Sequence, residues 1–280
     1  MNITAKTKIC MVIGDPVEHS LSPQIHNAGY RALGIDDDFV YVAASVKPED
    51  LASFVSGAKA MDIRGFSCKL PHKLGIMRYL DEIDEVAKTI GAVNTVVNDN
   101  GRFKGYNTDW VGIVAPLEAV TALKGKKVAL LGAGGAARAA AYGVANKGVE
   151  LTIYNRTLEK GKQLAEEFGG IARTLNDGAE IRSMDIIINA TSVGLPLTDN
   201  ETPLPQKFIT DKHIVLDAVY DSRDTRLLRE AKQQGALIIR GTEMLLHQGT
   251  AQFKLFTGRD APEDAMRNAF LAALDPPEAK

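Results

Sequence analysis

A glycine-rich turn between a buried strand and a helix constrains the fold of this chain more than any other feature. Four apolar residues, 128–131, precede Gly132-Ala133-Gly134-Gly135-Ala136-Ala137, and an alanine-rich stretch follows until Gly148. In this G-x-G-x-x-A spacing, missing side chains let the backbone turn sharply and approach a pyrophosphate at the positive end of the helix. Glycine–alanine runs also serve close packing, but the flanking strand and helix favour a dinucleotide site. The turn therefore predicts a Rossmann-type unit.

The segment after the next strand indicates which dinucleotide such a turn would hold. Enzymes that use NAD usually place an acidic residue about 20 residues after the turn, where it binds the ribose 2′-hydroxyl. This chain instead reads Tyr154-Asn155-Arg156-Thr157, with Lys160 one turn later. A planar arginine and a nearby lysine suit a 2′-phosphate, although both also fit the solvated start of a helix. Because no acid stands where NAD requires one, we expect NADP(H).

Strand and helix patterns alternate along the chain, which predicts an α/β fold with parallel sheets and crossover helices. The expected strands are 8–13, 39–44, 63–68, 92–97, 102–106, 128–131, 151–154, 186–190, 213–218 and 237–240. The expected helices include 23–33, 50–59 and 136–147. The turn residues Asn98-Asp99-Asn100-Gly101 predict a hairpin between the two strands that flank them. The final stretch contains two helices separated near 258–262, whose packing the pattern leaves open.

Length and composition fit two domains of a globular protein. We place a first domain near 1–109 and a doubly wound nucleotide-binding domain near 110–242. The net charge of −2, from 33 basic and 35 acidic residues, favours neither nucleic acid nor a membrane surface as partner. No apolar run approaches the roughly 18 residues of a membrane span, and the first eight residues lack a signal-peptide core. Two cysteines and five scattered histidines predict no disulfide framework and no metal site, so a cytoplasmic protein is expected.

Polar side chains cluster where strands end or helices begin. The four clusters are His19-Ser20-Leu21-Ser22-Pro23, Lys69-Leu70-Pro71-His72-Lys73, Gly91-Ala92-Val93-Asn94-Thr95 and Tyr106-Asn107-Thr108-Asp109. Each alone has a structural explanation: Ser22 as a helix cap before proline, Lys73 as an exposed lysine, Asn94 as a turn residue, Asp109 as a cap. Together they offer hydroxyls, an amide, an ammonium and a carboxylate, which suit a small substrate rich in hydroxyls. In redox chemistry with a dinucleotide, a lysine near a carboxylate can move the one proton that the protein must handle.

In this order, the clusters resemble those of the shikimate dehydrogenase family along essentially the whole chain. The matching motifs are Gly14 to Pro23, Pro71-His72-Lys73, Gly91 to Thr95, Asn107-Thr108-Asp109, the glycine turn, Asn155-Arg156-Thr157, Asn189-Ala190-Thr191-Ser192, Asp217-Ala218-Val219-Tyr220, Gly241 and Met244-Leu245-Leu246-His247-Gln248. The resemblance implies reduction of 3-dehydroshikimate to shikimate by NADPH, a step of aromatic amino-acid biosynthesis. It also implies that the C-terminal helices, 243–280, return to the first domain and complete it, with closure of a cleft around Asp109 and Gly241.

The same resemblance implies roles for individual residues. Lys73 and Asp109 would form the catalytic pair at the reacting hydroxyl, with Lys73 carrying the proton. The substrate-binding residues would be Ser20 and Ser22 at its carboxylate with Tyr220 nearby, and Asn94 and Gln248 at its ring hydroxyls. The residues lining the cofactor would be Gly132, Gly134, Gly135, Ala136, Asn155, Arg156, Thr157, Lys160, Thr191 and Gly241.

One position departs from the family pattern. The family usually has threonine or serine two residues before the proline of Pro71-His72-Lys73, where it contacts substrate, and this chain has Lys69. A lysine there either adds bulk and positive charge beside the substrate or turns outward and leaves a gap. Residues 245–258 also resemble the quinate/shikimate branch of the family. These residues and Lys69 leave a second interpretation open, a paralogue that acts on quinate or a related ring acid and uses NAD as well as NADP. A catalytically silent sensor and either a monomer or a homodimer also stay open.

Overall fold

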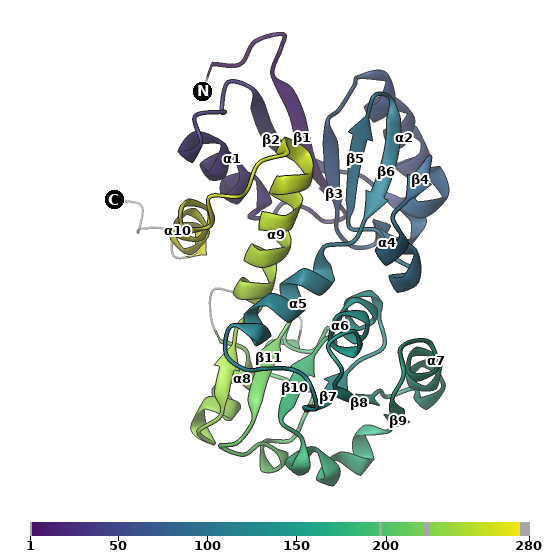
Figure 1. The fold of residues 1–280 in the computed structure, drawn as a ribbon, viewed down its shortest axis with the longest axis vertical. Helices are drawn as coiled ribbons and strands as arrows, with labels where there is room; N and C mark the ends of the chain where they lie inside the picture. The colour runs from purple at the N-terminus through teal and green to yellow at the C-terminus, as the bar shows by residue number, and fades with distance from the viewer. Residues whose placement is uncertain (1, 196–197, 221–223, 275–280) are drawn as a thin grey trace. The chain divides into compact units, whose positions relative to one another are not determined.

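The computed structural model describes residues 2–195, 198–220 and 224–274. It is an α/β protein with two sheets, as the alternation of strand and helix patterns predicts (Figure 1). The chain divides into two compact units: one contains the chain up to Thr108 and the segment from Gln248 onward, and the other is Asp109–His247. Within the described part of the chain, no helix is long and apolar enough to cross a membrane.

The first unit is built on a six-stranded sheet of order β2-β1-β3-β5-β6-β4. Its strands are β1 (Lys8–Gly14), β2 (Phe39–Ser45), β3 (Gly65–Cys68), β4 (Glu82–Ile83), β5 (Thr95–Asp99) and β6 (Arg102–Tyr106). Its α-helices are α1 (Ser22–Ala32), α2 (Leu51–Ala60), α3 (His72–Gly75), α4 (Glu85–Ile90), the end of α9 (Gly241–Thr257) and α10 (Glu263–Leu274). The sheet is mixed rather than parallel, because β5 pairs antiparallel with both β3 and β6.

The reversal of β5 comes from the hairpin that the turn residues predict. Asp99 and Arg102 form the last pair of the β5–β6 ladder. The two residues between them, Asn100 and Gly101, have φ angles of 52° and 83°. Positive φ at both loop residues is typical of the turns whose twist matches that of a two-stranded ribbon, and asparagine–glycine is the pair that tolerates it best. The hairpin prediction is confirmed.

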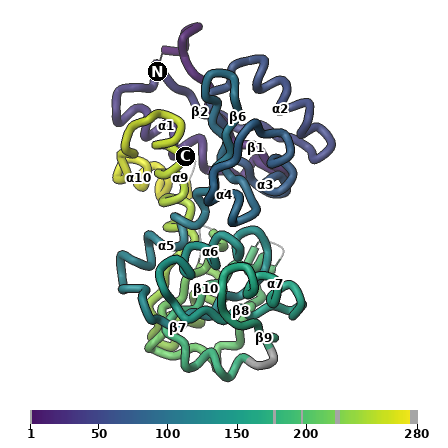
Figure 2. Tube along the Cα trace, turned by 45° about the vertical axis from the view of Figure 1, so that its right-hand side comes forward, coloured from purple at the N-terminus to yellow at the C-terminus, as the bar shows by residue number. Residues whose placement is uncertain are grey.

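The C-terminal helices pack on the N-terminal helix of the same unit. In Figures 1 and 2, α9 and α10, drawn in yellow, lie beside α1, drawn in purple. The close approach depends on Gly29 of α1, because a Cβ atom there would lie 2.7 Å from Phe253 Cε2 and 3.1 Å from Met266 Cγ. The two predicted C-terminal helices are therefore confirmed, and Gly29 opens the space that they fill.

The second unit is an all-parallel sheet of order β12-β11-β10-β7-β8-β9. Its strands are β7 (Lys127–Leu131), β8 (Glu150–Tyr154), β9 (Ile171–Arg173), β10 (Ile186–Asn189), β11 (Ile214–Asp217) and β12 (Leu237–Ile239). Its helices are α5 (Asp109–Glu118), α6 (Gly135–Ala145), α7 (Leu158–Phe168), α8 (Arg226–Gln233) and the start of α9. Counted from β7, this is the strand order 3-2-1-4-5-6 of dinucleotide-binding sheets.

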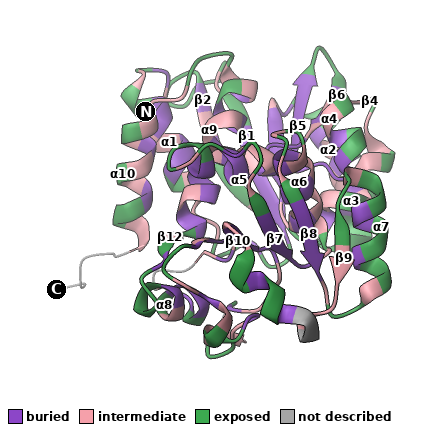
Figure 3. Cartoon of the chain, turned by 60° about the horizontal axis from the view of Figure 1, so that its bottom comes forward, coloured by how far each residue is buried: buried purple, intermediate pink, exposed green. Residues whose placement is uncertain are grey.

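Helices cover both faces of this sheet, so its central strands are buried (Figure 3). Val128 and Ile188 lie on the face that packs against α5, α6 and α7. Ala129 and Ile187 lie on the opposite face, in a cluster that includes Leu227 of α8. The order of the strands reverses between β7 and β10, and ligands of such sheets bind at the carboxyl ends of the strands on either side of that point.

Candidate functional site

The glycine turn lies at this reversal point, directly after β7. Gly132 has a φ of +110°, and a Cβ atom there would lie 3.0 Å from the carbonyl oxygen of Ala190 at the end of β10. In contrast, Cβ atoms at Gly134 and Gly135 would meet nothing within 4 Å. These two glycines therefore leave space above the N-terminus of α6 that side chains would otherwise fill. The space and the positive helix end fit a pyrophosphate.

Two cations lie at the end of β8, beside the turn. The loop is shaped by Asn155, whose Nδ2 donates to the carbonyl oxygen of Thr157 at 2.7 Å. Arg156 and Lys160 are both exposed, whereas the nearby carboxylate of Glu159 is paired with Lys162 at 2.9 Å. This end of β8 therefore offers two positive charges where a 2′-phosphate would lie in an NADP site.

A buried aspartate organises the ends of β10 and β11. The Oδ1 atom of Asp217 accepts from Asn189 Nδ2 at 2.8 Å and from the Val219 amide at 3.0 Å, and its Oδ2 accepts from Thr225 Oγ1 at 2.6 Å. Asn189 in turn accepts from the amide and hydroxyl of Thr191, at 3.0 and 2.7 Å. Burial raises the pKa of Asp217 to about 6, although these hydrogen bonds oppose the rise. Asp217 thus ties Thr191 to the segment that carries Tyr220.

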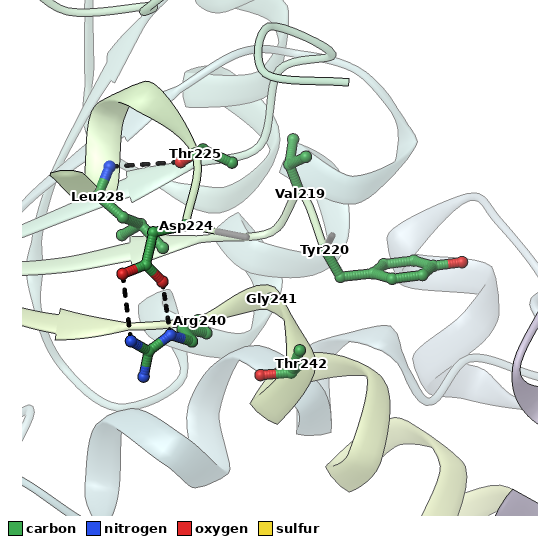
Figure 4. A pocket seen from close by; sticks show the side chains of 8 residues that line it. All are labelled: Val219, Tyr220, Asp224, Thr225, Leu228, Arg240, Gly241 and Thr242. Atoms are coloured by element: carbon green, nitrogen blue, oxygen red, sulfur yellow. Dashed lines mark hydrogen bonds and ion pairs between the residues drawn. The ribbon is translucent and has the colours of Figure 1, made fainter. Parts of the chain in front are cut away.

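A small pocket lies beside Tyr220 (Figure 4). Its lining residues are Val219, Tyr220, Asp224, Thr225, Leu228, Arg240, Gly241 and Thr242. Arg240 Nε donates to Asp224 Oδ1 at 2.6 Å, and the ring of Tyr220 points away from this pair. Gly241 accommodates the close approach of Val219, since a Cβ atom at Gly241 would lie 2.3 Å from the Val219 carbonyl oxygen. Burial raises the pKa of Tyr220, so its hydroxyl stays protonated near neutral pH.

In the first unit, polar residues gather at one end of the central strands of the sheet. Strands β1 and β3 end there and the antiparallel β5 begins there, so Lys69, after β3, and Asn94, before β5, lie at the same end of the strands. The carbonyl oxygen of Lys73 in α3 accepts from the amide of Val93 at 2.9 Å. The backbone of the predicted proton carrier is therefore fixed one residue from Asn94.

The structure brings Asn94 and Gln248 together. Asn94 Oδ1 accepts from the Thr108 amide at 2.8 Å, and its Nδ2 donates to Thr108 Oγ1 at 3.0 Å and to Gln248 Oε1 at 3.4 Å. Because a backbone amide only donates, its bond fixes which end of the Asn94 side chain is the oxygen. Asn94 is thus a buried, fully oriented amide rather than a turn residue. Asp109, which is also buried, follows Thr108 directly and begins α5.

The two serines of the first cluster lie side by side at the start of α1. Ser20 Oγ donates to Ser22 Oγ at 3.2 Å. The interpretation of Ser22 as a helix cap is wrong, because Leu21 occupies the cap position and Ser22 is the first helical residue. The side chain of Ser22 is buried without serving as a cap. The pair therefore presents hydroxyls next to the positive end of a helix, an arrangement that suits a carboxylate.

Lys69 lies on the α1 side of the sheet. Its amide donates to Ile13 O at 2.8 Å, which extends the β1–β3 ladder by one residue and places Lys69 on the same face as Ser67. A Cβ atom at Gly14 would lie 3.1 Å from Lys69 Cβ. Burial, and to a smaller extent the charge of Lys69, lower the pKa of His26 to about 3. His26 lies one turn after Ser22 in α1 and stacks on Tyr41, which bonds to Ser67, so α1 and its serines lie on the face of the sheet that carries Ser67.

Sequence reasoning gave no role to several polar residues around Asn94. These are Ser67 in β3, Thr95 in β5 and Gln252 in α9, all buried. The available signals were hydroxyl residues inside otherwise apolar strands and a glutamine one turn after Gln248. Among the residues that the structure describes, no three His, Cys, Asp or Glu side chains gather as a metal site requires.

Comparison with known proteins covers nearly the whole chain. Residues 12–96 match the profile of the shikimate dehydrogenase substrate binding domain, and residues 116–217 match the shikimate / quinate 5-dehydrogenase domain. Residues 241–269 match the shikimate 5′-dehydrogenase C-terminal domain.

Individual relatives match along nearly the whole chain. Shikimate dehydrogenase (NADP(+)) of Methanothermobacter thermautotrophicus is 42% identical, over 98% of this chain and 99% of the relative. A shikimate dehydrogenase crystallised with NADP+ is 40% identical, with a TM-score of 0.92 and coverage of 98% of each chain. A quinate dehydrogenase from Corynebacterium glutamicum, in complex with NAD, is 29% identical over 97% of this chain and 100% of its own, with a TM-score of 0.86.

Proposed function

The chain belongs to the shikimate dehydrogenase family, and from this we propose that it is an NADP-dependent shikimate dehydrogenase. It interconverts 3-dehydroshikimate and shikimate, a step of aromatic amino-acid biosynthesis. The observation that carries the proposal is the match to shikimate dehydrogenase (NADP(+)) along 98% of the chain, at 42% identity. The two cations at the end of β8, with Asn155-Arg156 where NAD enzymes usually carry an acid, agree with the NADP(+) named for that relative.

The proposed chemistry divides between the cofactor and two side chains. NADP, when bound, supplies the acceptor for the hydride that leaves the ring carbon. As that C–H bond breaks, Lys73 takes the proton of the ring hydroxyl on its Nζ, and the carbon–oxygen bond becomes a carbonyl. In the reductive direction Lys73 returns the proton to the carbonyl oxygen. Asp109 accepts a hydrogen bond from an N–H of Lys73 and so holds the lysine Nζ toward that hydroxyl.

The remaining side chains bind and orient the two ligands. We assign the substrate carboxylate to Ser20, Ser22 and Tyr220, and the ring hydroxyls to Asn94 and Gln248. The cofactor residues are Gly132, Gly134, Gly135 and Ala136 at the pyrophosphate, Arg156 and Lys160 at the 2′-phosphate, and Asn155, Thr157, Thr191 and Gly241 as further residues that line the cofactor. The hydroxyl pair of Ser20 and Ser22, and the space above Gly134 and Gly135, support these assignments.

Lys69 favours a second candidate within the same reaction class. Lys69 follows β3 on the face that carries Ser67, and α1 packs on that face through the stacking of His26 on Tyr41. A cation there attracts the carboxylate of shikimate and of quinate alike, but a lysine in place of threonine or serine alters the space and the donors available to the ring hydroxyls. The second candidate is therefore a quinate dehydrogenase or a dehydrogenase of a related ring acid, with NAD as an alternative cofactor.

One kinetic panel separates these candidates. The purified protein is assayed for oxidation of shikimate and quinate with NADP and with NAD, and kcat/KM is determined for each of the four pairs. The proposed function predicts the highest value for shikimate with NADP. A higher value for quinate establishes the second candidate, and dinucleotide binding without turnover of either acid would instead indicate a silent sensor.

We further propose that the enzyme works in the cytoplasm as a monomer or a homodimer. Light scattering of the purified protein at assay concentrations distinguishes the two states, and a larger assembly would contradict both.

A further inference from the structure

A continuous chain of buried hydrogen bonds leads to Asn94 along one face of the sheet, from Tyr41 of β2. It passes through five side chains from four elements, each at most 2% exposed: Tyr41, Ser67, Gln252, Thr95 and Asn94. The successive distances are 2.6 Å from Tyr41 Oη to Ser67 Oγ, 2.9 Å to Gln252 Oε1, 3.0 Å from Gln252 Nε2 to Thr95 Oγ1, and 2.8 Å to Asn94 Oδ1. The sheet register supports it, because Ser67 and Thr95 are directly paired.

The hydrogen bonds in this chain all run in one direction. Ser67 donates to the amide oxygen of Gln252, which can only accept, so Ser67 accepts from Tyr41. Gln252 Nε2 can only donate, so the hydroxyl of Thr95 accepts from it and keeps its own proton for Asn94. In a low-dielectric interior, such aligned bonds strengthen one another.

The chain ends by orienting two amides. Asn94 Oδ1 accepts from both Thr95 and the Thr108 amide, so its two lone pairs are used and its Nδ2 faces Thr108 Oγ1 and Gln248 Oε1. Gln248 therefore turns its oxygen toward Asn94 and its NH₂ group in the other direction. Without the Thr95 hydroxyl, Thr108 would be the only residue that donates to Asn94 Oδ1 in the described part of the chain, so the amide would be held less firmly.

We propose that Gln252 and Thr95 are positioning residues for the substrate, which they act on by fixing the donor ends of the Asn94 and Gln248 amides. This rests on the proposed function, in which those two amides bind the ring hydroxyls. Gln252 itself lies one helical turn beyond Gln248 in α9, so one helix carries both a substrate-binding amide and the residue that orients it.

The test uses matched changes at Thr95. Thr95→Val keeps the shape but removes the hydroxyl that links Gln252 to Asn94, and we expect the KM for shikimate to rise on the order of tenfold. Thr95→Ser retains the hydroxyl and restores the KM, while the KM for NADP stays unchanged in both. Thr152→Val makes the same chemical change at a buried threonine of β8 and leaves the shikimate KM unchanged. Gln252→Met, which keeps the length of the side chain but has neither the amide donor nor the amide acceptor, reproduces the effect of Thr95→Val.

Two outcomes overturn the proposal. One is an unchanged shikimate KM in Thr95→Val; the other is an equal rise in the KM values for shikimate and NADP that Thr95→Ser does not rescue, since a purely structural loss gives that pattern. A second readout needs no substrate: the side-chain NH₂ signals of Asn94, assigned by their loss in Asn94→Asp, should exchange faster with water in Thr95→Val than in wild type. Should the wild type fail to oxidise shikimate, the proposed function fails, whereas unchanged exchange in Thr95→Val refutes the chain of bonds itself.

Discussion

Asp217 makes a quantitative prediction about stability and pH. An exposed aspartate ionises near 3.8, whereas burial raises the pKa of Asp217 to about 6. Below pH 3.8 the carboxyl group is protonated in both the folded and the unfolded chain, and its contribution to stability is fully present. As the pH rises toward 6, the unfolded chain releases the proton first, so the folded state loses stability. A shift of about two units at about 1.4 kcal/mol each gives a total loss of about 3 kcal/mol.

The variant Asp217→Asn isolates this loss. It cannot titrate, yet it retains an oxygen for Asn189 and Val219, so any lost hydrogen bond changes its stability by the same amount at every pH. All other titrating groups are shared with the wild type. The free energy of unfolding of the wild type, measured relative to that of Asp217→Asn, should therefore fall by about 2 kcal/mol between pH 4.5 and 7.5. Urea unfolding followed by circular dichroism at several pH values measures both proteins.

A second aspartate provides a control in which stability should change with pH in the opposite direction. The backbone amide of Lys127, together with Lys126, holds the pKa of Asp185 below its usual value. Relative to Asp185→Asn, the wild type should gain stability as the pH rises toward 3.8, the value of an exposed aspartate, and change little above it. A difference between wild type and Asp217→Asn that is independent of pH, or that grows in favour of the wild type as the pH rises, would refute the reasoning about burial.

Three further substitutions test the proposed cofactor site, the proposed substrate site and the glycine turn. Arg156→Gln should raise the KM for NADP on the order of tenfold and leave the KM for NAD unchanged, because only NADP carries the 2′-phosphate; equal effects on both cofactors would contradict this role. Lys69→Thr should raise the KM for shikimate and not that for NADP, whereas a lower shikimate KM would indicate that Lys69 suits a different ring acid. Gly132→Ala should lower stability by about 1–3 kcal/mol, since φ is +110° and Ala190 O lies 3.0 Å from the new atom; a change within experimental error in urea unfolding would exclude that strain.

Local chemistry explains which elements the sequence predicts. The turn after β7 and the hairpin at Asn100-Gly101 depend on residues that only a few backbone conformations accommodate, so both were predictable from the chain alone. Two short strands, β4 and β9, were not predicted. Each has two or three residues and lies at an edge of its sheet. Their structure comes from pairing with a neighbouring strand, and a sequence pattern that short carries no signal.

Tertiary contacts decide the features that the sequence misses. The packing of the last two helices depends on the space at Gly29, which the pattern of the helices themselves does not reveal. The cap expected at Ser22 is lost because the helix begins one position earlier than the Ser-Pro pair suggests. The parallel first sheet predicted from alternation is mixed, because the hairpin reverses β5.

The candidate site, too, combines residues that the sequence predicts with contacts that only the folded chain reveals. The residues that the resemblance assigns to substrate and cofactor follow motifs that can be read in order along the chain, and their individual roles stay predictions. The connections among Ser67, Thr95 and Gln252 join strands and a helix up to 185 residues apart in the sequence. No local pattern links such positions, so only the folded chain reveals what orients Asn94.

The assignment of Lys73 as the proton carrier is tested most directly by one comparison. The kcat for NADP-dependent oxidation of shikimate is measured for the wild type and for Lys73→Ala, together with the dissociation constants of shikimate and NADP. We predict a fall in kcat of about 10²-fold or more, the scale of general acid–base catalysis, with the dissociation constant of NADP unchanged. A Lys73→Ala enzyme that keeps nearly the wild-type kcat would contradict the account.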